Sequence, residues 1–543
     1  MKTLAILLLT ATPAAALTCD GPTPEALGLK GVTFTEVAAV PAGEDSPVAQ
    51  CRIRGLMAER TGSDGQDYAL SFELALPDDW NGDFVHQFNG GNDGQVRPAT
   101  GALQAGTGDR SPLARGFAVI SSDAGHDGAA RPDRGIAGGA AFGADFEARQ
   151  MYGYKAVATL QPVAEQMVAA YYGREIGHNY GIGCSNGGRH AMVAASRMPE
   201  AFDGLLLGAP GFNLPRSALQ HAHDVQAFSA VNEDIRQAFS TEDLTLVADA
   251  ILAKCDALDG LADGISHDTA ACQQAFDVTT LQCAEGQNTA CLSAAQVTAL
   301  VAIHEGPQGA DGPLYSDWSW DAGIGAPNWR TWKLESGNPN WDRMPIIAVM
   351  GASSLAQVFT VPPVEVGGEP ADLLAYLRGF DLASQAGQID ATSDAYPESP
   401  MQVMAPPGAD DPDLTAFRDA GGKMMIYHGV ADPVFSVNDT ANWFAALNEN
   451  MGEAQDFAQF YPVPGMTHCQ GGPAAEAFDL LTPLIAWVKD GTTPEPVTAT
   501  VRANNEAAPE ALRGATRPLC PAPLVARYQG GDTADAASFA CQP

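Results

Sequence analysis

Apolar stretches of strand length recur between about residues 65 and 210, at 68–76, 83–88, 117–122, 180–183 and 205–207. Residues 152–172 instead carry apolar side chains at helical spacing, and residues 188–198 predict a second helix. Strands that alternate with helices are typical of a mostly parallel sheet covered on both faces. This part of the chain therefore predicts an α/β fold.

The pattern changes after residue 211. Residues 212–408 contain four cysteines and many Trp, Gly and Pro residues, and their apolar spacing predicts helices without matching strands. Strand patterns return at 423–428 and 457–461. We therefore predict one α/β domain, formed by residues 17–211 and 409–543, that is split by a lid domain at 212–408. The stretch from about residue 500 is expected to wrap back onto this domain.

The first 16 residues predict a secretory signal peptide. A lysine at position 2 precedes a short apolar run, and small residues precede a cleavage site near Ala16. The run is far shorter than the roughly 20 residues that span a bilayer, and no later stretch is long and apolar enough. We expect a secreted or periplasmic, soluble protein.

The cysteines agree with an oxidising compartment. All ten lie beyond the predicted signal peptide, and none forms a C-x-x-C metal motif. Sequence alone does not fix their pairing, but proximity along the chain suggests four local bridges and leaves one long-range bridge: Cys19–Cys51, Cys255–Cys272, Cys283–Cys291, Cys520–Cys541 and Cys184–Cys469.

The net charge of −36 restricts the partners of the chain. Such a surface repels nucleic acid and anionic membranes, so neither is an expected partner. The charge indicates a soluble protein and leaves the reaction open. The oligomeric state is open as well.

A candidate nucleophile follows the strand at 180–183. Ser185 is the centre of Gly-Cys-Ser-Asn-Gly at 183–187, a G-x-S-x-G sequence of the kind that exposes a serine on a strained turn between a strand and a helix. The sequence therefore predicts a serine hydrolase in which Ser185 attacks the substrate.

Two cysteines flank the residues that this reaction needs. Cys184 directly precedes Ser185, and Cys469 directly follows His468. A disulfide between them would hold their Cα atoms about 4.4–6.8 Å apart. It would thus bring the serine beside a histidine that is distant in sequence, so we expect His468 to be the general base.

A third group must orient the imidazole and stabilise its cation. Asp432 lies in the loop after the strand at 423–428. The resulting order Ser, Asp, His along the chain is that of α/β-hydrolases. Asp439 is a weaker candidate, which we expect to cap the helix near Ala441.

Two backbone N–H groups are needed to stabilise the oxyanion. One is expected from Asn186, the residue after the nucleophile. The other is expected from the glycine-rich loop at 89–94, with Gly91 as the first choice and Gly90 as the alternative. Glycine lets the backbone approach a substrate without a Cβ in the way. An ordinary hairpin turn is the competing interpretation of this loop.

An acidic loop lies inside the predicted lid, between Cys255 and Cys272. Closely spaced carboxylates and backbone carbonyls can converge on a hard cation, although the spacing is not that of an EF-hand. The alternative is an acidic loop exposed to solvent. We predict a structural Ca²⁺ held by Asp256, Asp259, Leu261, Asp263 and Ile265.

These motifs resemble those of the tannase and feruloyl esterase family over nearly the whole mature chain. The residues that carry the resemblance are the motif at 183–189, Asp-Ala-Gly-His at 123–126, Phe-Asp-Gly at 202–204, Gly-Ala-Pro at 208–210, the loop at 256–265, Asp432 and the pair at 468–469. The resemblance implies an α/β-hydrolase core, a lid with structural calcium, and hydrolysis of esters of aromatic acids. Members cleave gallate, ferulate or related hydroxycinnamate esters, and one branch hydrolyses mono(2-hydroxyethyl) terephthalate.

The terephthalate branch is similar in some details and differs in another. Phe435 follows Asp432 by three residues, as in that branch, and could clamp a substrate ring; the suggested cysteine pairs also resemble its set. That branch binds a free carboxylate through a lid arginine, and residues 344–363 contain none; Arg330 and Arg343 are nearby in the sequence, but neither is matched to that arginine. Trp329, Trp332 and Phe359 are candidate walls for an aromatic acyl group, and ordinary core packing is equally open for each.

We therefore expect a secreted serine esterase that acts on small esters of aromatic acids, of feruloyl, galloyl or terephthaloyl type, through an acyl-enzyme. One alternative is a hydrolase specific for mono(2-hydroxyethyl) terephthalate. Others are a peptidase or acyltransferase on the same core, and a non-catalytic polyphenol-binding protein. The last requires a broken triad, whereas all three members are present here.

Overall fold

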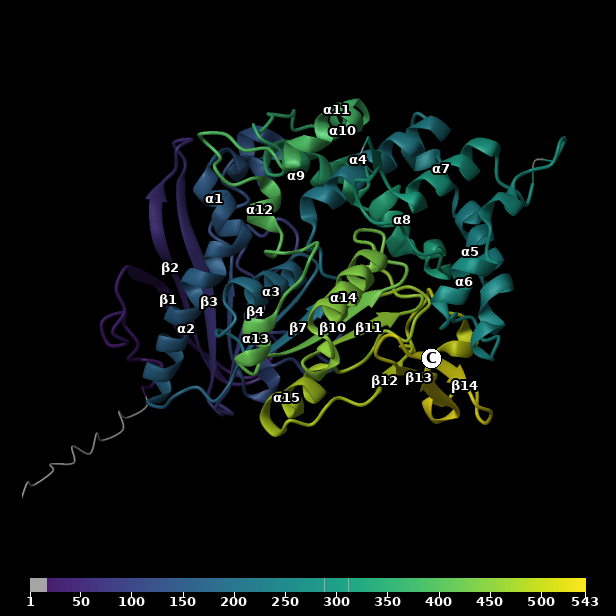
Figure 1. The fold of residues 1–543 in the computed structure, drawn as a ribbon. Helices are drawn as coiled ribbons and strands as arrows, with labels where there is room; N and C mark the ends of the chain where they lie inside the picture. Colours follow the sequence, from purple (N-terminus) through teal and green to yellow (C-terminus); the bar gives the residue numbers. More distant parts are fainter. Residues whose placement is uncertain (1–16, 288, 311) are drawn as a thin grey trace, which may run out of the picture.

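A nine-stranded sheet forms the centre of the computed structural model, which describes residues 17–287, 289–310 and 312–543 (Figure 1). The predicted signal peptide at 1–16 lies outside the described residues. In spatial order the strands are β1 (Val32–Val40), β2 (Gln50–Thr61), β3 (Asp67–Pro77), β5 (Ala118–Ser122), β4 (Phe84–Phe88), β6 (Asn179–Cys184), β7 (Gly204–Gly208), β10 (Lys423–Gly429) and β11 (Ala458–Val463).

Six of these strands run parallel to one another. β1, β2 and β3 form an antiparallel edge, and β3 pairs antiparallel with β5. All neighbours from β5 to β11 then pair in parallel. The prediction of a mostly parallel sheet is confirmed. Because parallel strands end at the same edge, the loops after β4, β6, β10 and β11 meet there.

Both faces of the sheet are covered. Leu205 and Leu207 of β7 pack into one apolar cluster, and Leu206 between them packs into another. α3 (Asn186–Arg197) and α14 (Val437–Met451) cover the first face, whereas α15 (Leu481–Asp490) covers the second. This explains why β7 is apolar at successive positions, since a strand buried on both faces needs no polar alternation.

The chain between β7 and β10 adds no strand to this sheet among the described residues. It contains one short hairpin, β8 (Gln308–Gly309) with β9 (Gly312–Pro313), and Figure 1 shows most of its helices grouped beyond one end of the sheet. The lid limits at 212 and 408 stay a prediction. Its helices are α4 (Leu214–Val231), α5 (Thr241–Cys255), α6 (Thr269–Ala275), α7 (Ala294–Glu305), α8 (Pro327–Lys333), α9 (Ala352–Gln357), α10 (Pro370–Gly379), α11 (Leu382–Gln385) and α12 (Pro400–Met404).

The remaining elements lie before β6, before β10 and at the C-terminal end of the chain. The predicted helix at 152–172 is α2 (Ala156–Tyr172), preceded by α1 (Phe146–Gln150) and one π-helical turn; α13 (Thr415–Asp419) precedes β10. The chain ends in two antiparallel ribbons. They pair β12 (Val497–Thr500) with β13 (Thr516–Leu519), and β14 (Val525–Tyr528) with β15 (Phe539–Gln542).

All five suggested disulfides are confirmed. Cys520–Cys541 joins the end of β13 to β15, and Cys255–Cys272 joins α5 to α6. In the part of the chain that is described, no helix combines the length and the apolar character that a membrane span requires.

Candidate active site

Ser185 occupies a strained turn between β6 and α3. Its φ of 66° and ψ of −127° lie in a region that residues other than glycine rarely adopt. The turn is tight: a Cβ at Gly187 would lie 2.4 Å from the Phe88 carbonyl oxygen. The Ser185 amide donates to the Gly208 carbonyl at 2.9 Å. These contacts fix the serine at the carboxyl edge of the sheet, as the G-x-S-x-G motif predicts.

His468 and Asp432 meet at the same edge. The His468 ring lies with Nδ1 2.8 Å from Asp432 Oδ2. The other oxygen of Asp432 accepts hydrogen bonds from the amides of Val434 at 2.7 Å and Phe435 at 3.2 Å. Asp432 is only 2% exposed, so this carboxylate has a fixed direction.

His428 is a second imidazole beside this carboxylate. Its Nε2 lies 3.4 Å from Asp432 Oδ2, and its Nδ1 lies 2.9 Å from Thr440 Oγ1. Burial acts to raise the pKa of Asp432, but the charges and hydrogen bonds of His468 and His428 outweigh it and hold that pKa well below its usual value. Asp432 is therefore ionised, as a group that orients an imidazole must be.

The long-range disulfide connects the two halves of this arrangement. Cys184 and Cys469 are bonded with their Cα atoms 6.1 Å apart, which brings the loops of Ser185 and His468 together. No hydrogen bond joins Ser185 Oγ to the His468 ring within the described residues. Hydrogen bonds of this kind are often long or poorly aligned before substrate binds and tighten in the complex.

The glycine-rich loop after β4 lies against the nucleophile. A Cβ at Gly90 would be 3.7 Å from that of Ser185, and Gly91 lines the pocket that contains the serine. Gly91 has a φ of 68°, which favours glycine. Asn186 begins α3, so its N–H belongs to the first turn, where no intrahelical acceptor exists. The two expected oxyanion donors thus come from separate elements.

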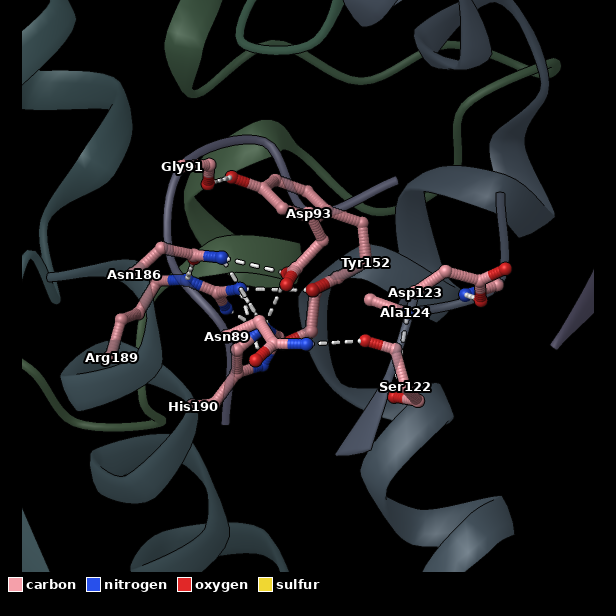
Figure 2. Close-up of polar contacts among 12 residues, drawn as sticks. Asn89, Gly91, Asp93, Ser122, Asp123, Ala124, Tyr152, Asn186, Arg189 and His190 are labelled. Carbon is pink, nitrogen blue, oxygen red and sulfur yellow. Dashed lines mark hydrogen bonds and ion pairs between the residues drawn. The ribbon is translucent and has the colours of Figure 1, made fainter. Parts of the chain in front are cut away.

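A buried polar network, which the sequence analysis missed, joins these two elements (Figure 2). Asp93 Oδ2 accepts from Asn186 Nδ2 at 2.8 Å and lies 2.9 Å from His190 Nε2. Arg189 Nε donates to Asn186 Oδ1 at 2.6 Å, and Tyr152 Oη donates to the Gly91 carbonyl at 3.2 Å. The loop at 89–94 is thereby tied to the start of α3.

Burial dominates the electrostatics of this network. It raises the pKa of Asp93 to about 7, and it lowers the pKa of His190 well below its usual value, with the positive charge of Arg189 adding to the effect. A sequence signal existed: Asn186, Arg189 and His190 are polar at helical spacing on a helix that the fold must bury.

Aromatic rings border the serine's pocket. Phe435 and Phe359 line it, as the sequence analysis expected. Trp332 lines it as well and packs edge-to-face on His468, with ring centroids 5.0 Å apart; Phe435 does the same at 5.5 Å. Trp329 does not line this pocket; its side chain lines a different cavity, next to Asp432. The orientation of α8 decides which of the two tryptophans faces the serine.

Asp439 has neither of the roles considered for it. The cap of α14 is Ser436, whose side chain accepts from the amide of Asn438, so the capping expectation was wrong. Asp439 lies in the first turn of that helix and accepts hydrogen bonds from Asn213 Nδ2 at 3.1 and 3.2 Å. Burial raises its pKa to about 7.

The acidic loop of the lid is ordered by its own backbone. Asp256 accepts from the amides of Asp263 and Gly264 at 3.1 and 2.9 Å, and Asp259 accepts from Leu261 and His267 at 3.1 and 2.9 Å. Burial raises the pKa of Asp259 to about 6, and the charge of Asp263 adds to this effect. The hydrogen bonds from the backbone of Leu261 and His267 oppose it.

One arginine forms an ion pair with this loop. Arg517 of β13 donates from its guanidinium to Asp263 Oδ2. Across the described residues, no three His, Cys, Asp or Glu side chains are arranged as a ready metal site. The loop carbonyls of Leu261 and Ile265 and the remaining carboxylate oxygens are the hard ligands that calcium takes. The calcium site stays a prediction.

Comparison with known proteins identifies the family of the chain. Residues 51–542 match the family described as tannase and feruloyl esterase. Mono(2-hydroxyethyl) terephthalate hydrolase of Piscinibacter sakaiensis is 39% identical over 90% of this chain and 84% of its own length. A probable feruloyl esterase B-2 of Aspergillus fumigatus is 26% identical over 82% of this chain and 78% of its own.

Two solved structures share the fold. Feruloyl esterase B from Aspergillus oryzae has a TM-score of 0.73 at 23% identity, covering 95% of this chain and 97% of its own. Tannin acyl hydrolase from Aspergillus niger has a TM-score of 0.64 at 20% identity, covering 96% of this chain and 95% of its own. They confirm the predicted α/β-hydrolase fold. The chain belongs to the tannase and feruloyl esterase family and is a carboxylic ester hydrolase.

Proposed function

We propose that this chain is a secreted serine esterase that cleaves esters of aromatic carboxylic acids with the triad Ser185, His468 and Asp432. The observation that carries the proposal is the hydrogen-bonded pair of His468 and ionised Asp432. The Cys184–Cys469 disulfide holds this pair beside the turn that contains Ser185. The five disulfides and the predicted signal peptide support export.

The reaction proceeds in two steps. His468 takes the proton of Ser185 Oγ as this oxygen attacks the ester carbonyl, and the N–H groups of Gly91 and Asn186 hold the oxyanion. His468 then gives the proton to the departing alcohol, leaving the acid bound to the serine as an acyl-enzyme. Water, deprotonated by the same imidazole, attacks this ester; the imidazolium then returns the proton to Ser185 Oγ as the acid is released. Asp432 stabilises the imidazolium in both steps.

The expected substrates are aromatic at the acyl side. Initial rates with methyl gallate, methyl ferulate and mono(2-hydroxyethyl) terephthalate should exceed the rate with methyl cyclohexanecarboxylate, a non-aromatic ester with a ring of similar size. The rings of Trp332 and Phe435 provide the physical reason, because stacking and edge contacts favour an aromatic partner. Faster cleavage of the cyclohexane ester than of all three aromatic esters would contradict the proposal.

A second candidate is a hydrolase specific for mono(2-hydroxyethyl) terephthalate. It is favoured by the 39% identity to the relative of that name. The same rate comparison separates the two, since this candidate requires the terephthalate monoester to be cleaved far faster than the gallate and ferulate esters.

We further propose that the loop at 256–265 binds one structural calcium ion within a lid formed by residues 212–408. Burial raises the pKa of Asp256 and of Asp259, and the charge of Asp263 adds to both effects, so a cation would stabilise the ionised carboxylates. Removing calcium with EGTA should therefore lower Tm by about 2–3 °C for a chain of 543 residues, if the ion is otherwise present at about 100 times its Kd. Differential scanning fluorimetry with and without added calcium measures this shift.

A matched pair of variants makes the calcium test specific. Asp256→Asn should lose the response of Tm to calcium, whereas Asp249→Asn, on the exposed side of α5, should keep it. An unchanged Tm of the unmutated protein in EGTA would mean that Arg517 alone compensates the charge of the loop.

A further inference from the structure

A histidine without a regular hydrogen bond lies in the wall of the serine's pocket. His221 of α4 lines this pocket together with Ser185, Met350 and Phe435. Its side chain is buried, with the residue 7% exposed, and neither ring nitrogen makes a hydrogen bond of regular geometry with a described residue. Leaving a buried polar group unpaired costs free energy, so a native structure that retains one invites an explanation in terms of function.

The surroundings of His221 keep its ring in place and uncharged. The backbone of Gly351 packs against it so closely that a Cβ there would lie 2.6 Å from Nδ1. Burial lowers the pKa of His221 to about 3, and the charge of Lys333 adds to this; a backbone hydrogen bond with Val434, too poorly aligned to count as a regular one, opposes it. Lys333 is itself paired with Asp224 in a buried ion pair. The imidazole is therefore neutral, with one N–H donor and one acceptor nitrogen.

Other hydroxyl groups of the pocket wall are already engaged. Ser217 Oγ donates to the Leu214 carbonyl at 2.9 Å, and Ser354 Oγ donates to Asn92 Oδ1 at 3.0 Å. No lysine or arginine belongs to the described lining of this pocket. A ligand carboxylate would therefore be buried without a cation, which is costly. A hydroxyl group, in contrast, matches a neutral imidazole because it can both donate and accept.

We propose that His221 is the specificity-determining residue of this pocket and that it hydrogen-bonds a hydroxyl group on the aromatic ring of the acyl moiety. The assignment rests on the proposed function, since it needs the acyl group to occupy the pocket beside Ser185. It selects hydroxylated aromatic acids over their unsubstituted and carboxylated counterparts. A site that pairs its polar group with a substrate hydroxyl discriminates strongly against the analogue without it, because that polar group is then left unpaired.

The test compares pairs of esters that differ only in ring hydroxyl groups: methyl 4-hydroxycinnamate with methyl cinnamate, and methyl gallate with methyl benzoate. We expect kcat/KM of the unmutated enzyme to favour the hydroxylated member of a pair at least about 100-fold. His221→Phe should remove most of this preference by slowing the hydroxylated ester while sparing the unsubstituted one. His221→Gln, which keeps a donor and an acceptor, should restore part of it.

His223→Phe is the matched control. It lies on the same helix, but its Nε2 lies 3.0 Å from the Ala302 carbonyl, and it is outside the pocket. This variant should keep the preference for hydroxylated esters. Tm gives a second readout: His221→Phe should not lower it, because an apolar ring replaces an unpaired polar one. If His221 had a purely structural role, His221→Phe should instead lower Tm.

Binding separates this inference from the proposed reaction. In the Ser185→Ala background, calorimetry should show tighter binding of methyl 4-hydroxycinnamate than of methyl cinnamate, and His221→Phe should abolish the difference. If binding follows this pattern but the unmutated protein does not cleave these esters, the proposed function fails and the role of His221 stands. If the preference in binding is absent, or survives in His221→Phe, the role of His221 is refuted.

Discussion

Ser185→Ala is expected to lower kcat for an aromatic ester by about 10⁴-fold or more, because no other group can form the acyl-enzyme. The fold should persist. Alanine is no bulkier than serine, and Ser185 donates no side-chain hydrogen bond to another described residue, so Tm should stay within a few degrees. Steady-state kinetics and thermal denaturation measure the two effects.

Ser196→Ala is the matched control for this prediction. Ser196 lies on the same helix, α3, and its Oγ donates to the Met192 carbonyl at 3.2 Å, away from the pocket. This variant should keep its activity. An organophosphonate that labels active-site serines should modify the unmutated enzyme and the control at Ser185 and leave Ser185→Ala unmodified. Activity of Ser185→Ala near that of the control would rule out this nucleophile.

Local patterns were sufficient to predict the parallel part of the sheet and the antiparallel strand next to it. Alternation at 68–76 corresponds to β3 (Asp67–Pro77), and the apolar run at 205–207 lies within β7. β1 and β2 were not predicted. The burial of β1 does not alternate regularly along the strand, so its apolar side chains do not form the two-residue period that identifies a half-buried strand.

A site residue could be predicted only where the residues next to it in the sequence identify its role. Ser185 stands in a motif, and His468 stands beside a cysteine. Asp93 has no such neighbour: it matters because β4 and α3 are adjacent in space, which no local pattern encodes. Trp329 and Trp332 are both aromatic and three residues apart, and only the packing of α8 determines which one contacts the His468 ring.

Loss of the Cys184–Cys469 bridge is expected to impair both stability and catalysis. Its cysteines are 285 positions apart, and closing so long a loop in the unfolded chain corresponds to about 6 kcal/mol in the loop-entropy model. The double variant Cys184→Ala/Cys469→Ala should therefore unfold at a clearly lower Tm. Its kcat/KM, measured well below that Tm, should fall about 10–100-fold, because small displacements of catalytic groups have effects of this size.

The bridge between Cys283 and Cys291 offers a control that separates the two effects. Its cysteines are only 8 positions apart and do not line the serine's pocket, so removing it should cost about 2–3 kcal/mol in the same model and leave kcat/KM unchanged. A bridge that acts only as a covalent tie would behave like this control, with lower Tm and normal turnover. A bridge that also sets the distance from Ser185 to His468 loses turnover even where the protein remains fully folded. Normal turnover in the folded Cys184→Ala/Cys469→Ala protein would therefore confine the bridge to a role in stability.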